Sequence, residues 1–141
     1  MDAYNRYQAD KIMTAAPEQL IRMLLDRAVG ELELGRDLLR EDRWQVATPH
    51  LAKAQDILTE LRCSLNLDVG GELAANLDAL YDYAFRRIVE AHIQRVAGFV
   101  DEVIAIIDPI RDAWATAVCG AADADANTPV LTAVRGVGAG A

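Results

Sequence analysis

The sequence predicts an all-α protein, an antiparallel up-down four-helix bundle, and two patterns along the chain support this fold class. Apolar residues recur at spacings of three and four in four separate stretches, as expected for one face of an α-helix. The connections between these stretches are short, and nothing in the sequence reads as a series of strands and turns. With 141 residues, 52% of them hydrophobic, the chain is long enough for one domain with a sizeable core.

The first expected helix begins at Pro17 and ends near Leu38 and Leu39. Proline suits the first helical position because its missing N–H would have no partner there. Glu18 follows, and its negative charge is favourable at the positive end of the helix dipole. Asp42 is expected to cap the second helix, because an aspartate carboxylate accepts hydrogen bonds from the free N–H groups of a first turn.

The second expected helix has the most regular pattern in the chain, with steps that alternate between three and four residues. Such a pattern is typical of the apolar stripe of a helix in a bundle. Pro49 lies inside the stripe and leaves two alternatives open, a kink in one helix or a new helix that Thr48 caps. The stripe consists of Trp44, Ala47, Leu51, Ala54, Leu58, Leu61 and Leu65.

The third and fourth expected helices cover about residues 72–94 and 96–118. Gly70 and Gly71 come before the third helix, and glycine tolerates the positive φ that a tight connection needs. Pro109 is expected to bend the fourth helix. The expected inward stripe of the third helix consists of Leu73, Leu77, Leu80, Ala84, Ile88 and Ala91.

These helices make up one bundle domain, which we expect to span residues 17–118. Residues 1–16 precede it as an N-terminal arm or a short helix. Residues 119–141 contain mainly Ala, Gly and Asp without a period, and this composition predicts a disordered tail. A short strand or helix around residues 129–134 stays open as an alternative.

Charge and cysteine content narrow the classes of partner. The net charge of −8 disfavours non-specific binding to nucleic acid or to an anionic membrane surface. No apolar run approaches the ~20 residues of a membrane-spanning helix, and the N-terminus lacks the pattern of a signal peptide. Cys63 and Cys119 match no metal-binding spacing and are expected to be free thiols. The sequence therefore predicts a cytosolic protein without nucleic-acid binding or membrane insertion.

The residue patterns that catalysis or metal binding would need are missing. A di-metal site in a helix bundle needs carboxylates and Glu-x-x-His pairs, but neither His50 nor His92 has an acidic residue three positions before it. Ser64 has no neighbours that suggest a nucleophile, and no glycine-rich phosphate-binding motif is present. We therefore expect no enzymatic activity, no metal and no cofactor.

One cluster of charges suggests a contact between helices. Asp82 and Arg86 are four residues apart, so they lie on one helical face and can pair. One hypothesis is a buried ion pair that joins the third helix to Asp26 on the first, which would fix the register between them. The alternative is a solvated pair within one helix.

Several stretches, taken together, resemble the FliS family of flagellin export chaperones. They occur in the order and spacing of that family from residue 1 to about 118, so only the tail is uncovered. The run LDALYDYAFRRIVEA, together with the N-terminal tyrosine pair, is highly specific. The matching stretches are AYNRYQ at 3–8, TAAPEQLIRMLLD at 14–26, KAQDILTEL at 53–61, SLNLDVGGELAANLDALYDYAFRRIVEAHI at 64–93 and IRDAWATA at 110–117.

The resemblance implies a cytosolic helical bundle that binds the C-terminal segment of newly made flagellin. Such a chaperone covers the segment, prevents premature polymerisation and delivers the subunit to the flagellar type III export apparatus, without nucleotide or metal. The resemblance also implies further partners, namely a component of the export gate, an anti-sigma factor and an assembly factor that binds flagellin.

On this basis two sets of residues are expected to bind the client. Tyr4, Tyr7 and Ile12 either fold over an empty client groove and shift when flagellin arrives, or pack permanently on the bundle. The groove itself is expected to present apolar side chains to an amphipathic peptide. Its expected residues are Leu58, Leu61, Leu65 and Leu67 from the second helix and its end, and Leu73, Leu77 and Tyr81 from the third.

Two other classes of function stay open at this point. One is a regulatory module that sequesters an anti-sigma factor or a regulator of flagellin translation instead of escorting cargo. The other is a bundle that binds a small ligand, and the lack of convergent polar residues argues against it.

Overall fold

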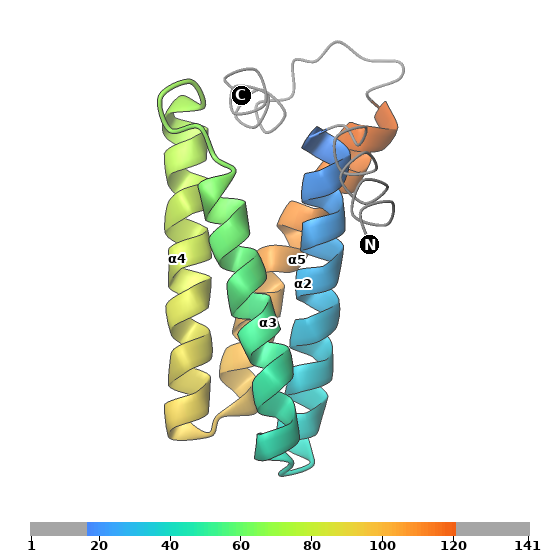
Figure 1. Ribbon diagram of the computed structural model, residues 1–141, viewed down its shortest axis with the longest axis vertical. Coiled ribbons are helices and arrows are strands. Elements are labelled where there is room, and N and C mark those ends of the chain that lie inside the picture. Colours follow the sequence, from blue (N-terminus) through green and yellow to red (C-terminus); the bar gives the residue numbers. More distant parts are fainter. Residues whose placement is uncertain (1–16, 121–141) are drawn as a thin grey trace, which may run out of the picture.

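The structure, a computed structural model, describes residues 17–120 and consists of four α-helices that run alternately in opposite directions (Figure 1). The helices are α2 (Pro17–Arg40), α3 (Trp44–Cys63), α4 (Gly71–Gln94) and α5 (Ala97–Gly120). The predicted all-α four-helix fold is confirmed, and the expected helix ends lie within a few residues of those observed. The predicted N-terminal arm and nearly all of the predicted tail lie outside the described residues.

The helices surround one core in the order α2, α3, α4, α5, because each packs against the next and α5 packs against α2. The α2 helix makes the more extensive contacts with α3 and α5, and α4 covers the remaining side. Burying one large apolar side chain contributes about 1.5–3 kcal/mol, so this core dominates the stability of the fold. Its largest fully buried side chains are Trp114, Tyr81, Leu25, Leu32, Leu51, Leu58, Leu61, Ile88 and Ile107.

The stripe predicted for α4 is correct except at one position. Leu80 was expected to point inward, but it is 39% exposed, whereas its neighbour Tyr81 is 1% exposed. Successive helical residues differ by about 100° around the axis, so only one of this pair can lie at the centre of the core. The larger ring of Tyr81 fills that place, and burial raises the pKa of its hydroxyl.

The predicted N-cap role of Asp42 is wrong, because this residue ends α2 instead. Asp42 adopts a positive φ of 61°, which aspartate tolerates better than most residues. The N–H of Asp42 donates to Leu39 O at 3.0 Å, and the N–H of Arg43 donates to Leu38 O at 2.9 Å. This is the Schellman motif of a helix C-terminus. The Asp42 carboxylate accepts a hydrogen bond from Trp44 Nε1 at 3.3 Å, and α3 has no side-chain cap.

Both internal prolines lie within continuous helices. Pro49 is part of α3 and Pro109 is part of α5, so the alternative in which Thr48 caps a new helix is wrong. The Thr48 hydroxyl instead donates to Trp44 O at 2.9 Å, within the first turn of α3. The carbonyl of Trp44 thus accepts a side-chain hydrogen bond in the turn where Pro49 has no backbone N–H to donate.

We predict opposite effects for two glycine substitutions in α2. A Cβ at Gly35 would lie 2.6 Å from Leu51 Cδ2, whereas a Cβ at Gly30 would meet nothing within 4 Å. Because Leu51 is fully buried, Gly35→Ala should lower the free energy of unfolding by about 1–3 kcal/mol. Gly30→Ala should raise it by about 0.5–1 kcal/mol, since alanine favours helix. Urea unfolding followed by circular dichroism measures both. Equal stabilisation by the two variants would contradict the close packing of α2 on α3.

Candidate apolar binding surface

Four of the residues predicted to line a client groove lie in the core of the bundle. Leu58, Leu61 and Tyr81 are at most 1% exposed, and Leu77 is 5% exposed. They therefore do not form a surface groove in this structure, and that part of the expectation needs correction. The physical reason is that their stripes face the bundle axis, where all four helices bury their apolar residues.

The other three predicted groove residues lie together at one end of the bundle, where α3 passes into α4. Leu65 and Leu73 are half-buried against the core, and Leu67 is 55% exposed. The sequence reasoning missed Val69, which is 59% exposed in the same connection. We call Leu65, Leu67, Val69 and Leu73 the apolar end. Figure 1 shows this connection at the same end of the bundle as the start of α2 and the end of α5, but on the opposite side of that end.

The connection that carries the apolar end is held by its own hydrogen bonds. Asn66 Oδ1 accepts from the N–H groups of Asp68 and Val69 at 3.1 and 3.0 Å. The N–H of Gly70 donates to Asn66 O at 2.7 Å, and Gly71 begins α4 with a positive φ of 58°. Asparagine forms such turns readily, and glycine tolerates this φ. Several N–H groups of the connection are thus paired locally, while the side chains of Leu67 and Val69 are more than half exposed.

Further exposed apolar residues lie on α4. Leu80, Tyr83, Val89 and Ile93 are 39%, 39%, 37% and 77% exposed. Tyr83 is not free, because its hydroxyl donates to Glu102 on α5. Tyr83, Val89 and Ile93 lie off the apolar stripe predicted for this helix, and that position was the available signal in the sequence. Leu80 gave no such signal, because the prediction placed it on the stripe.

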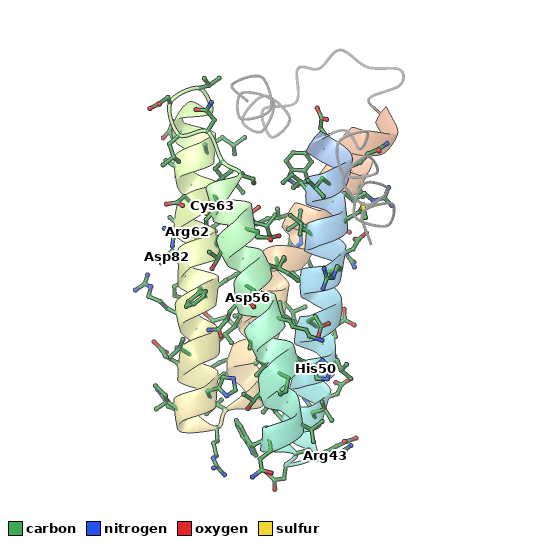
Figure 2. The ribbon with its side chains drawn as sticks, in the orientation of Figure 1. Arg43, His50, Asp56, Arg62, Cys63 and Asp82 are labelled. Atoms are coloured by element: carbon green, nitrogen blue, oxygen red, sulfur yellow. The ribbon has the colours of Figure 1, made fainter. Side chains whose placement is uncertain are left out.

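The predicted ion pair between Asp82 and Arg86 is present, but its proposed link to Asp26 is wrong. Arg86 Nε lies 3.1 Å from Asp82 Oδ2, and both side chains are substantially exposed. The partner across the helix interface is Arg62 on α3, whose Nη1 donates to Asp82 Oδ1 at 3.0 Å (Figure 2). Asp26 lies near Arg22 and Arg111 instead. The reason is topological, because α2 packs against α3 and α5, and α4 lies across the core from it.

The N-terminal residues predicted to contact the client, Tyr4, Tyr7 and Ile12, lie outside the described residues. Their contribution stays a prediction.

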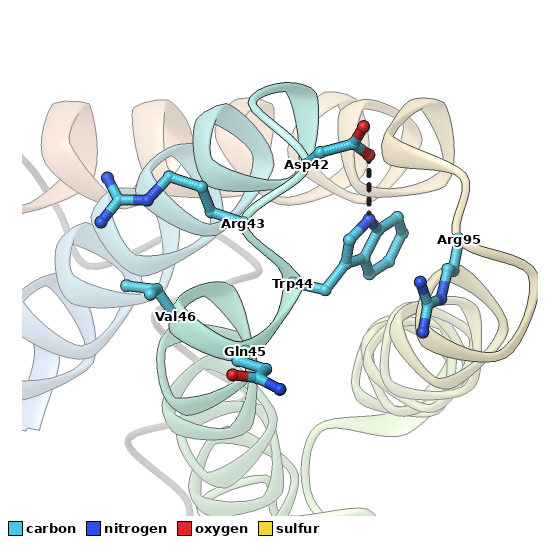
Figure 3. A pocket seen from close by; sticks show the side chains of 6 residues that line it. All are labelled: Asp42, Arg43, Trp44, Gln45, Val46 and Arg95. Carbon is cyan, nitrogen blue, oxygen red and sulfur yellow. Dashed lines mark hydrogen bonds between the residues drawn. The ribbon is translucent and has the colours of Figure 1, made fainter.

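A shallow pocket lies at the opposite end of the bundle from the apolar end, where α2 passes into α3. Its volume is about 350 Å³. The guanidinium of Arg95 lies 5.4 Å from the ring centroid of Trp44, and Asp42 accepts from the indole N–H (Figure 3). The charged groups of Asp42 and Arg95 are thus both engaged with the indole of Trp44. The lining residues are Asp42, Arg43, Trp44, Gln45, Val46 and Arg95.

The histidines have structural surroundings. His50 Nδ1 lies 2.7 Å from Glu31 Oε2 and so joins α3 to α2. His92 is half-buried, and desolvation lowers its pKa. Within residues 17–120, no group of three or more His, Cys, Asp or Glu side chains could hold a metal ion. In the same part of the chain, no helix is long and apolar enough to cross a membrane.

Comparison with known proteins identifies the family of the chain. The family model described as flagellar protein FliS matches residues 1–121. The chain belongs to the FliS family. The flagellar secretion chaperone FliS of Bacillus subtilis is 35% identical to this FliS-family chain. The match covers 82% of the present chain and 85% of the relative. The flagellar secretion chaperone FliS of Salmonella typhimurium is 36% identical, and this match covers 73% of the present chain and 77% of the relative.

The fold agrees with FliS-family membership. A solved structure described as a flagellar chaperone from bacteria is 26% identical and superposes with a TM-score of 0.67. The match covers 84% of this chain and 96% of that one. The resemblance predicted from the sequence is thereby confirmed. The family match ends at residue 121, so residues 122–141 lie beyond it.

The ion pairs between α3 and α4 lead to a prediction on pH. Hydrogen bonds from Arg62 hold the pKa of Asp78 below its usual value. The contribution of Asp78 to stability is therefore present above an ordinary aspartate pKa of about 3.9 and is lost as pH falls through the lower folded value. The pair is partly exposed, so Asp78→Asn should lower the free energy of unfolding at pH 7 by at most about 1 kcal/mol. The difference should shrink as the pH falls below the ordinary aspartate value and Asp78 becomes protonated.

The matched control for this prediction is Asp56→Asn on α3. Asp56 is exposed and forms no ion pair among the described residues. Its substitution should change stability by less than about 0.5 kcal/mol at either pH. Chemical unfolding at pH 7 and pH 2 measures both variants, and a pH-independent loss in Asp78→Asn would contradict the pairing with Arg62.

Proposed function

We propose that this protein is a cytosolic export chaperone that binds the C-terminal segment of flagellin. It would prevent premature polymerisation of flagellin and escort the subunit to the flagellar type III export apparatus. The observation that supports this proposal most is membership of the FliS family, in which relatives of 31–36% identity are described as flagellar secretion chaperones. The four-helix fold and the exposed apolar residues at one end of the bundle agree with it.

The chemistry of the surface fits an amphipathic client. Leu67 and Val69 offer apolar contacts on a connection in which several backbone N–H groups are already paired, so a client that covers these groups would not leave them without a partner. An amphipathic helix binds such a surface through its own apolar face. A client that is disordered before binding must be ordered on the chaperone, and this cost keeps the complex releasable.

Calorimetry with a peptide that spans the C-terminal segment of the host flagellin tests the proposal. We expect saturable 1:1 binding with a negative heat-capacity change, the mark of apolar burial. Absence of binding by the folded, helical protein would contradict the assignment. In that case the purified protein should be tested against an anti-sigma factor.

A matched pair of variants locates the site in the same titration. Leu67→Asp at the apolar end should weaken binding by about tenfold or more, which corresponds to about 1.4 kcal/mol. Ile93→Asp is the control, because Ile93 is even more exposed but lies at the far end of α4. Neither change should alter stability by more than about 0.5 kcal/mol. Equal effects of the two variants on affinity would argue against the apolar end as the site.

The N-terminal tyrosines give a further prediction. If Tyr4, Tyr7 and Ile12 form a movable cover for the client site, deletion of residues 2–13 should change client affinity and leave the unfolding midpoint nearly constant. If they pack permanently on the bundle, the deletion should mainly lower the midpoint. Thermal unfolding and calorimetry on the same preparation separate the two cases, and an unchanged affinity with an unchanged midpoint would contradict both.

A further inference from the structure

The chain continues for 20 residues beyond the end of the family match at residue 121. Most of this extension is Ala, Gly and Asp, but residues 129–134 read Pro-Val-Leu-Thr-Ala-Val, which is apolar and carries no charge. Arg135 follows directly and is the only basic residue after Arg111. A short apolar segment at the end of a polar linker is a plausible ligand for an apolar surface on the same chain.

The extension begins at the end of the bundle where the apolar end lies. The α5 helix ends at Gly120, at the same end of the molecule as the connection between α3 and α4 (Figure 1). Eight residues lie between Gly120 and Pro129, and an extended chain from one to the other reaches roughly 30 Å. Packed helices are about 8–10 Å apart, so the linker is long enough to cross the end of the bundle.

The apolar end offers the complementary surface. Leu67 and Val69 are more than half exposed, and Leu65 and Leu73 are only half-buried. The charged residues of this connection and of the first turn of α4 are acidic, Asp68 and Glu72, and both are exposed. Neither forms an ion pair within residues 17–120. An apolar segment followed by one arginine therefore matches both the apolar patch and its acidic rim.

We propose that residues 129–134 dock on the apolar end of their own chain when no client is bound, with Arg135 beside Asp68 and Glu72. The contact is intramolecular, so its effective concentration is in the millimolar range and a weak contact suffices. The docking itself needs no client. Its regulatory consequence rests on the proposed function, since a client that uses the same surface must displace the segment.

The test uses four full-length proteins without client: the wild-type chain, Leu131→Asp, Arg135→Glu and the control Val137→Asp. Hydrogen exchange of residues 65–73 and binding of the dye ANS report exposure of the apolar end. Leu131→Asp should speed exchange there and increase dye fluorescence, because a buried leucine becomes charged. Arg135→Glu should do so to a lesser extent, and Val137→Asp should match wild type. The substitutions lie outside residues 17–120, so the helical circular dichroism signal of the bundle should be retained.

Client affinity is measured separately on the same proteins. A docked segment lowers the apparent affinity by the fraction of free sites, so Leu131→Asp should bind the flagellin peptide several-fold more tightly, by roughly three- to tenfold. If no protein binds the peptide but exchange still differs, the proposed function fails and the docking stands.

Three results would overturn the docking. The first is identical exchange at residues 65–73 in all four proteins. The second is faster exchange only when residues 2–13 are deleted, which would make the N-terminal arm the occupant. The third is a difference that depends on protein concentration together with a dimer in sedimentation, which would make a second copy the source of the segment.

Discussion

Every other feature of this protein depends on the burial of four helical stripes against one another in one continuous core. The side chains that fill its centre include Tyr81 and Trp114, each at most 1% exposed. Large aromatic side chains at these positions fix how far apart the helices lie. The interior of the bundle is therefore committed to stability, and contacts with a partner must use what the helices leave at the surface and at the ends.

Outside this core, charged side chains on the flanks of the helices form bridges between neighbouring helices. Each of the four interfaces between neighbouring helices has at least one bridge between charged side chains, and all of these bridges are partly exposed. Exposed ion pairs contribute about 0–1 kcal/mol each, so they set the register between helices more than they stabilise the fold. The bridges are Glu31–His50 between α2 and α3, Arg62–Asp78 and Arg62–Asp82 between α3 and α4, Arg87–Glu102 between α4 and α5, and Arg36–Asp101, Arg40–Asp101 and Arg111–Asp26 between α5 and α2.

The fold was accessible from the sequence because helical periodicity is a local property. The stripe of α3 and the limits of all four helices follow from spacing and from residues such as Pro17. Asp42 was misassigned because the end of one helix and the start of the next compete for the same residue, and only the backbone shows that α2 takes it. Asp26 was misassigned because a sequence does not state which helices lie diagonally across a bundle.

The residues of the proposed binding surface were harder to predict from the sequence, for a different reason. An apolar residue at helical spacing has the same pattern whether it faces the core, as Leu58 does, or a partner. The position of Leu67 in a connection, outside the stripe, is a better indicator of an exposed apolar side chain. Exposure separates these cases, and it depends on how all four helices pack.

The two tryptophans of the chain lie in contrasting surroundings. Trp44 lies partly exposed at the end where α2 passes into α3, beside Arg95 and the Asp42 carboxylate. Trp114 lies in the last turns of α5 and is fully buried, and its indole N–H has no hydrogen-bond acceptor within residues 17–120. An indole beside charged groups and an indole in an apolar core emit at different wavelengths and differ in their sensitivity to quenchers. The bundle thus contains one intrinsic optical reporter toward each end, and the melting of each end can be followed without a label.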